Sequence, residues 1–191
     1  MASVSGGDKL AAFLKKIREL NGDVDVGFFE GDKYPQRSYN INGEQVSAGE
    51  AVEVAYIAKL MEYGTGENGI PDIHITDKQR KFLHAIGFHL RNDTKSLHIP
   101  ARPFFKKTLE DNRKHYIELF QKALIQFDYD MVKSLESVGA VMSDDVKKAI
   151  ADVTEPKNHG FTIQQKGFDK PLKGKGSSIL QKSVKHKVSH K

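Results

Sequence analysis

One apolar run decides how this chain folds. It reads Val54-Ala55-Tyr56-Ile57-Ala58-Lys59-Leu60-Met61-Glu62-Tyr63-Gly64. Its apolar residues cover more than one face of a helix, which is typical of a helix that is buried on more than one side. The acids Glu50 and Glu53 suit a first helical turn, and Gly64 suits a C-terminal stop. We therefore expect a central helix over residues 49–63, packed on a sheet and against either a second helix or a neighbouring subunit.

The residues before this helix predict one helix and a few short strands. Apolar residues at helical spacing indicate a helix over 9–20, and Asn21-Gly22 is a suitable end for it. A short β-type run follows at 24–29. Asn42-Gly43 is the commonest two-residue hairpin signal, and it predicts a hairpin within residues 37–46.

The residues after the central helix predict mostly helix. Ile73-His74-Ile75 indicates a short strand, and Thr76 is a suitable cap for a helix over 77–90. Pro103 fits the first turn of a long helix that runs to about Gln126, because the N–H that proline lacks would have no partner within the helix there.

A second long helical register follows at 131–150, and Glu155-Pro156 ends it. Its apolar stripe comprises Met131, Leu135, Val138, Met142, Val146 and Ile150. We expect this helix to break near Gly139, because Ser143-Asp144-Asp145 has the composition of a new N-cap.

The charge of the chain is unevenly distributed. The 191-residue sequence has a formal net charge of +5. Residues 157–191 hold nine lysines and one acid, Asp169, which gives +8, so the other residues carry 5 − 8 = −3. Such a segment fits docking on an acidic protein or contact with nucleic-acid phosphate, and a solubilising tail explains the same composition.

The same segment has too few apolar residues for a core of its own. Weak strand character remains at Phe161-Thr162-Ile163 and over 178–188. We therefore divide the chain into an α+β core domain, residues 1–156, and a basic C-terminal segment, residues 157–191, that becomes ordered on assembly. The expected fold class is α+β, with a small, mainly antiparallel sheet packed with helices, one long helix and a basic C-terminal extension.

The composition excludes several kinds of site. The chain has no cysteine, which excludes disulfides, thiolate nucleophiles and Cys-ligated zinc. No apolar run approaches the about 18 residues that span a bilayer, and the first residues lack the apolar stretch of a signal peptide. We expect a protein that folds in a cytoplasm and has no membrane partner.

No motif supports catalysis or cofactor binding. Lys173-Gly174-Lys175-Gly176-Ser177-Ser178 is similar to a phosphate-binding loop, but Asp169 and Gly176 stand where that loop needs a glycine and a Ser or Thr. The histidines lack the spacing of metal ligands, and His186 and His190 lie among lysines that disfavour a cation. We predict no enzyme, no cofactor, no metal and no catalytic residue.

Four segments, in this order, carry a resemblance to a known family. They are Val26-Gly27-Phe28-Phe29, the run 54–64 quoted above, Ile99-Pro100-Ala101-Arg102-Pro103-Phe104-Phe105 and Lys166-Gly167-Phe168-Asp169-Lys170-Pro171-Leu172. With the helices between them they span most of residues 24–188. The chain resembles the small neck and tail-completion proteins of long-tailed bacteriophages, which join the DNA-filled head to the tail. The helix that ends in an aromatic-Gly pair and the Ile-Pro-x-Arg-Pro-Phe run are the more specific segments.

The resemblance implies an α+β protein without a cofactor that acts by assembling. It implies a structural virion protein, made in the host cytoplasm, that forms a ring of six or twelve copies at the head–tail junction. Its other partners would be the head connector or stopper and the tail terminator or tube proteins. An alternative from another class is a DNA-binding accessory protein that uses the lysine-rich C-terminus, and non-specific contact with genomic DNA is compatible with either function.

The chain departs from its relatives at two places. In many relatives the Tyr-Gly helix end and the Ile-Pro-x-Arg-Pro-Phe run lie close together, whereas residues 67–98 intervene here as an added strand and helix. Relatives also tend to follow Pro-Leu with an acid and Thr-Gly, where this chain has Lys173-Gly174-Lys175-Gly176.

The segments around 63–66 and 99–105 are the expected subunit or partner interface. Arg102 lies between two prolines, so its guanidinium is held ready to bind a carboxylate of a neighbour bidentately. Ordinary helix boundaries explain the same residues without an interface. The interface residues that we predict are Tyr63, Gly64, Pro100, Arg102, Pro103, Phe104, Lys173 and Lys175.

Overall fold

The structure of the protein is a computed structural model, and it describes residues 7–18, 21–41, 43–47, 49–66, 69–174 and 178–189. The elements in chain order are α1 (Gly7–Arg18), β1 (Asp23–Phe28), β2 (Ser38–Ile41), β3 (Glu44–Ser47), α2 (Val54–Tyr63), β4 (Ile73–His74), α3 (Asp77–Ala85), β5 (Ser96–Leu97), α4 (Phe105–Asp111), α5 (Arg113–Gln126), α6 (Met131–Asp152), α7 (Gly160–Lys166), α8 (Ile179–Lys182) and β6 (Val184–Ser189). The strands form small antiparallel sheets of two strands each, and α6 is the long helix. The α+β fold class predicted from the sequence is therefore confirmed.

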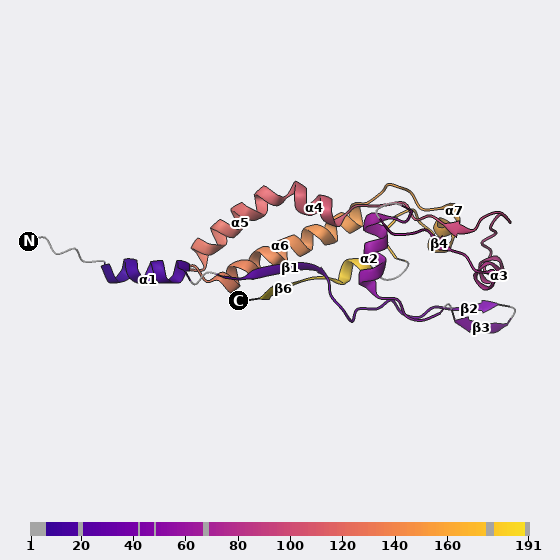
Figure 1. The fold of residues 1–191 in the computed structure, drawn as a ribbon, viewed down its shortest axis with the longest axis horizontal. Helices are drawn as coiled ribbons and strands as arrows, with labels where there is room; N and C mark the ends of the chain where they lie inside the picture. Colours follow the sequence, from indigo (N-terminus) through magenta and orange to yellow (C-terminus); the bar gives the residue numbers. More distant parts are fainter. Residues whose placement is uncertain are drawn as a thin grey trace, which may run out of the picture.

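The molecule is elongated, and its elements divide into two regions (Figure 1). The core region contains α6, the β1–β6 ribbon, the α4–α5 pair, α2 and the short α8. Within it, α6 lies between the α4–α5 pair and the ribbon, and contacts both. The distal region contains the β2–β3 hairpin, the β4–β5 pair, α3 and α7. Helix α1 extends away from the opposite end of the molecule.

The principal core joins residues from most of the length of the chain. Its centre consists of fully buried valines on α2, α6 and β6, namely Val54, Val146 and Val184. The other buried members of this cluster are Ala58, Phe104, Ile150, Leu172 and Leu180. Phe28 packs its ring edge-on against Phe104, with 6.2 Å between the ring centroids. Burial of these side chains is the main stabilising term for the core region.

The C-terminal residues belong to this core, which differs from the sequence-based division of the chain. Strand β6 pairs with β1 in the register Asp23↔Ser189 to Phe28↔Val184. Leu172, Leu180 and Val184 are at most 7% exposed. The boundary predicted near Pro156 therefore separates residues that share one core. The segment has few apolar residues, but those few lie where β1, α2 and α6 complete their burial.

Helix α6 is continuous and does not break near Gly139 as predicted. Asp130 caps its N-terminus, since the Asp130 carboxylate accepts the N–H of Lys133 at 3.1 Å. At Gly139 a Cβ would lie 2.7 Å from Val24 and 2.8 Å from the ring of His186. The glycine therefore allows the helix to approach the β1–β6 ribbon closely, a tertiary role that a sequence pattern does not distinguish from a helix break.

Helix α2 begins later than the sequence predicts, and it is buried mainly on one side. Residues before it are held extended, because Tyr34 donates its N–H to the Val52 carbonyl and Val54 donates its N–H to the Asp32 carbonyl. Tyr56 and Tyr63 are 54% and 44% exposed. Its buried residues are Val54, Ala58, Leu60 and Glu62. That a neighbouring subunit covers the exposed side of α2 stays a prediction.

Three other predicted elements differ in the structure. Phe161-Thr162-Ile163 lies in helix α7 and not in a strand, because His159 caps its start and Gly167, in the left-handed region, ends it. The strand expected over 178–188 is helix α8 followed by β6. The long helix expected from Pro103 is divided at Asn112 into α4 and α5.

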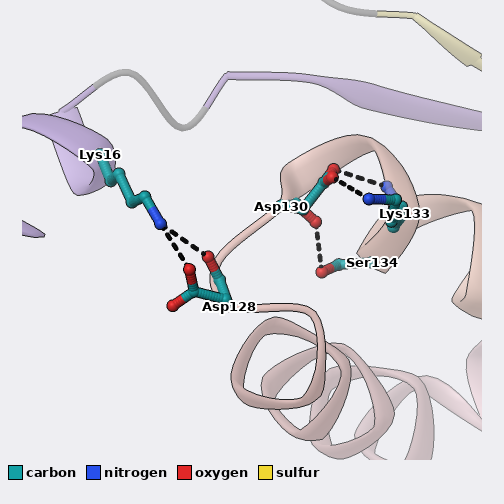
Figure 2. Close-up of polar contacts among 5 residues, drawn as sticks. All are labelled: Lys16, Asp128, Asp130, Lys133 and Ser134. Carbon is teal, nitrogen blue, oxygen red and sulfur yellow. Dashed lines mark hydrogen bonds and ion pairs between the residues drawn. The ribbon is translucent and has the colours of Figure 1, made fainter.

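Helix α1 is attached to the turn between α5 and α6. Lys16 forms an ion pair with Asp128 at 2.6 Å, as Figure 2 shows, and the Phe13 ring packs edge-on against Tyr129 at 4.9 Å. Asp128 and Tyr129 both have positive φ angles, 51° and 61°, so the turn is tight. Among the described residues, no helix is both long and apolar enough to cross a membrane.

Candidate interaction site

The C-terminal end of α2 binds directly to the start of α4. Glu62, on the last turn of α2, is 7% exposed. Its Oε2 accepts the N–H groups of Phe104 and Phe105 at 2.9 and 2.8 Å, and its Oε1 accepts the N–H of Lys106 at 2.9 Å. Helix α4 has no side-chain cap of its own at Phe104. A carboxylate from another helix therefore satisfies the N–H groups that the first turn leaves unpaired, and its negative charge favours that end of the helix.

The residues that follow α2 pack against the 99–101 segment. Gly64 has φ +71°, and a Cβ there would lie 2.6 Å from the Ala101 nitrogen and 2.8 Å from the Ile99 oxygen. The N–H of Arg102 donates to the Met61 carbonyl at 2.7 Å. Only glycine allows two backbones to approach this closely in that conformation.

Thr65 closes the junction with three hydrogen bonds. Its N–H donates to the Ile99 carbonyl at 2.8 Å, and its Oγ1 accepts the Ile99 N–H at 2.7 Å. The hydroxyl donates in turn to Asp72 Oδ1 at 2.9 Å, and His98 Nδ1 lies 3.0 Å from the same oxygen. These two hydrogen bonds hold the pKa of Asp72 below its ordinary value, with that of His98 the larger cause. We call residues 61–65 together with 99–106 the α2–α4 junction.

Arg102 fastens the α2–α4 junction to the segment after α6. Its side chain is 5% exposed. Nε donates to the Pro156 carbonyl at 2.8 Å, and Nη2 donates to the Lys157 carbonyl at 3.1 Å. The guanidinium predicted to bind a neighbour's carboxylate thus binds two carbonyls of its own chain. Burial lowers the pKa of Arg102, and the charge of Asp169 opposes this effect.

The structure brings most of the predicted interface residues together. Tyr63, Gly64, Pro100, Arg102, Pro103 and Phe104 all lie in the α2–α4 junction or directly beside it. Of these, Tyr63 and Pro103 are exposed, whereas Arg102 and Phe104 are buried. Lys173 is exposed and lies at a groove beside the junction. Lys175 lies outside the residues that the structure describes.

The groove lies between α2, the segment before the β2–β3 hairpin, and the chain around α7. Its volume is about 810 Å³. Its lining includes Tyr34, Arg37, Ile57, Met61, Lys166 and Lys173. Burial raises the pKa of the Tyr34 hydroxyl. Burial and the charge of Arg102 lower the pKa of Lys166, whose Nζ donates to the Lys170 carbonyl at 2.5 Å.

The predicted interface does not include Glu62, which lies in the junction, or Asp72, which accepts a hydrogen bond from Thr65 of the junction. Glu62 is the only acid in the run 54–64, and it stands within one turn of the helix end. An acid among apolar residues is a signal that it is buried with a specific partner. Its partners, however, lie more than 40 residues away along the chain, and no local pattern identifies them.

Two features of the C-terminal lysines bear on the DNA-binding alternative. Lys185 forms an ion pair with Asp32 at 2.7 Å. Lys187 lies directly opposite Asp25 in the β1–β6 ribbon. Both lysines therefore lie near carboxylates of the same chain, which reduces the local positive potential that DNA phosphates would meet.

Within the described ranges, no group of three or more His, Cys, Asp or Glu side chains is arranged to hold a metal ion. Comparisons of the chain with protein-family models, with curated proteins and with solved structures found no match.

Proposed function

We propose that this chain is a structural virion protein of a tailed bacteriophage, which forms a ring at the head–tail junction as a neck or tail-completion protein. The observation that carries the proposal is the α2–α4 junction. The two most specific segments of the resemblance, 54–64 and 99–105, are far apart in the sequence, yet Glu62, Gly64 and Met61 bind them into one unit. A shared motif that forms one structural unit is stronger support than two separate matches.

The junction also accounts for one departure from the relatives. The chain leaves this unit after Thr65 and returns to it at Ile99, and these two residues are hydrogen-bonded to each other. An insertion between two positions already in contact does not require the surrounding fold to change. The intervening strand, helix α3 and second strand project into the distal region (Figure 1).

The proposed mechanism is assembly. Exposed apolar side chains lie on elements of the core region, among them Tyr56, Ile117, Ile125 and Val132, which are between 41% and 71% exposed. Burial of such side chains between copies drives subunit packing, and charged groups fix the register. The ring would have one face toward the head connector or stopper and another toward the tail terminator or tube.

The test is a stop codon early in the gene, within the genome that encodes it. We expect filled heads and separate tails to accumulate without infectious particles, and expression of the intact chain in trans to restore joining. Antibody labelling of complete particles should place the chain at the junction between head and tail. Normal infectious particles that lack the chain would refute the proposal.

A further inference from the structure

The β1–β6 ribbon has one covered face and one open face. Helix α6 packs against the face that carries Val24 and His186, and the His186 Nε2 lies 2.8 Å from Glu136 on that helix. The opposite face is polar and exposed: it carries Asp23 and Asp25 on β1, and Lys185 and Lys187 on β6. The charges are therefore separated by strand, with the acids on β1 and the bases on β6.

The ribbon also has two outer edges. Among the residues that the structure describes, the sheet contains only these two strands. For residues 24–28 and 184–189, the backbone hydrogen bonds found in the described part of the chain are those between the two strands. Apart from each other, β1 contacts chiefly α6 and α2, and β6 contacts chiefly α6 and α8. Unpaired strand edges of this kind are templates for pairing with another chain.

We propose that the outer edge of β1 in one copy pairs antiparallel with the outer edge of β6 in a second copy of the same chain. This proposal rests on the ring-forming function and specifies how its subunits join. In the antiparallel register that opposes all four charges, Asp23 of one copy faces Lys187 of the next, and Asp25 faces Lys185. Opposite charges across adjacent strands stabilise a sheet, and like charges destabilise it.

The charge pattern selects this pairing over the symmetric ones. Pairing β1 with β1 would set acids against acids, and pairing β6 with β6 would set lysines against lysines. A β1-to-β6 contact is head-to-tail, so each copy keeps one edge free for the next, and the contact closes into a ring when the rotation between copies permits. Within each copy, β1 and β6 already run antiparallel. Antiparallel pairing of β6 with β1 of the next copy therefore continues the alternating strand directions.

The experiment uses the absence of cysteine from the chain. We would prepare two full-length variants, Asp25→Cys and Lys185→Cys, each with one cysteine and with the other charges of its strand intact. Both substituted positions are exposed. A third variant, Lys107→Cys, places an exposed cysteine on α4, outside the two strands of the ribbon, as the control. Each variant alone, and each pairwise mixture, is oxidised to form disulfides at rising protein concentration, and the mass of the wild-type oligomer is measured in parallel.

The pairing predicts covalent dimers in the Asp25→Cys and Lys185→Cys mixture, together with a wild-type oligomer. Each variant alone, and each mixture with Lys107→Cys, should give roughly tenfold less dimer, because identical positions in adjacent copies lie two strand spacings apart, about 10 Å, which is beyond the reach of a disulfide. An oligomer without the mixed cross-link, or with cross-links in either single variant, would overturn the pairing but leave the ring function standing. A wild-type chain that remains monomeric at every concentration would also overturn it, whereas the ring function itself is decided by the stop-codon experiment.

Discussion

The core region and the distal region of this molecule are stabilised in different ways. In the core region, Val54, Val146 and Val184 are at most 1% exposed, and segments from both ends of the sequence meet. In the distal region, α3 has no fully buried residue. The contacts of the distal region are local caps and ring pairs, such as Tyr39 against Phe82, whose ring centroids are 5.4 Å apart. The core region therefore depends on apolar burial over long sequence separations, and the distal region depends on turn chemistry and single side-chain contacts.

The largest effect is expected from deleting one segment of each region. Removing residues 157–191 takes β6, Leu172 and Leu180 out of the core, so we expect the remaining chain to lose cooperative unfolding. Replacing residues 67–98 with a short glycine linker should leave a folded core, because Thr65 and Ile99 are already in contact. Circular dichroism and thermal melting distinguish the two variants. A folded 1–156 fragment would restore the boundary near Pro156 that the sequence predicts.

The next largest effect is expected at Glu62. Replacement by alanine leaves three N–H groups at the start of α4 without their acceptor, and a hydrogen bond to a charged group contributes about 1.5–3 kcal/mol. We expect Glu62→Ala to lower the free energy of unfolding by at least that amount in urea denaturation. The matched control is Glu110→Ala, whose side chain is 65% exposed. Equal stability of the two variants would show that the carboxylate cap does not stabilise the junction.

Alanine substitutions at two glycines distinguish the cost of a steric clash from the cost of backbone strain. Gly64 and Gly87 have φ of +71° and +88°, but an added Cβ meets backbone atoms at Gly64 and nothing within 4 Å at Gly87. Gly87→Ala should therefore cost about 1–2 kcal/mol for conformation alone. Gly64→Ala, in the core region, should cost more, because the backbones must also move apart. Urea denaturation of both variants measures the difference, and a similar loss at the two sites would contradict the close packing of the junction.

The smallest effect concerns the pH dependence of the α6 cap. The Asp130 carboxylate accepts hydrogen bonds from the backbone N–H and the side chain of Lys133 (Figure 2). These bonds hold the pKa of Asp130 below its ordinary value, and the backbone N–H is the larger cause. A depressed carboxyl pKa contributes stability that is present above the unfolded-state pKa of about 3.9 and is lost as the pH falls toward and through the folded value. We expect Asp130→Asn to reduce slightly the loss of melting temperature between pH 5 and pH 3, which are roughly the bounds of that range. An unchanged slope would show that the cap carries no charge-dependent stabilisation.

The sequence predicts well those elements whose signals are local. The apolar stripe over 131–150 identifies α6, and the hairpin at residues 38–47 forms as β2 and β3. The Thr76 cap is present, and the Thr76 N–H donates the reciprocal hydrogen bond to the Gln79 side chain. These features depend on residues within one or two turns of each other. The spacing of neighbouring residues determines these elements, and that spacing can be read directly from the sequence.

The sequence does not reveal features that depend on distant partners. Gly139 has the composition of a helix break, but its role is set by Val24 and His186 on the ribbon. Phe161-Thr162-Ile163 is short enough to suit either a strand or a helix, and caps at His159 and Gly167 select the helix. The candidate site is similar: the sequence indicates its segments, but only the folded chain shows that Glu62 binds 104–106 and that Arg102 is used internally.

The pairing of β1 with β6 has a consequence for the order of events during synthesis. The strand at 23–28 emerges from the ribosome early, but its partner at 184–189 is translated more than 150 residues later. At roughly 5–20 residues per second, β1 waits on the order of ten seconds or longer without its partner. Contacts of such high sequence separation also slow folding itself, because the loop between them must first be closed. The nascent chain thus carries an unpaired strand throughout most of its translation, and chaperone binding near residues 23–28 is expected to influence its yield more than binding elsewhere.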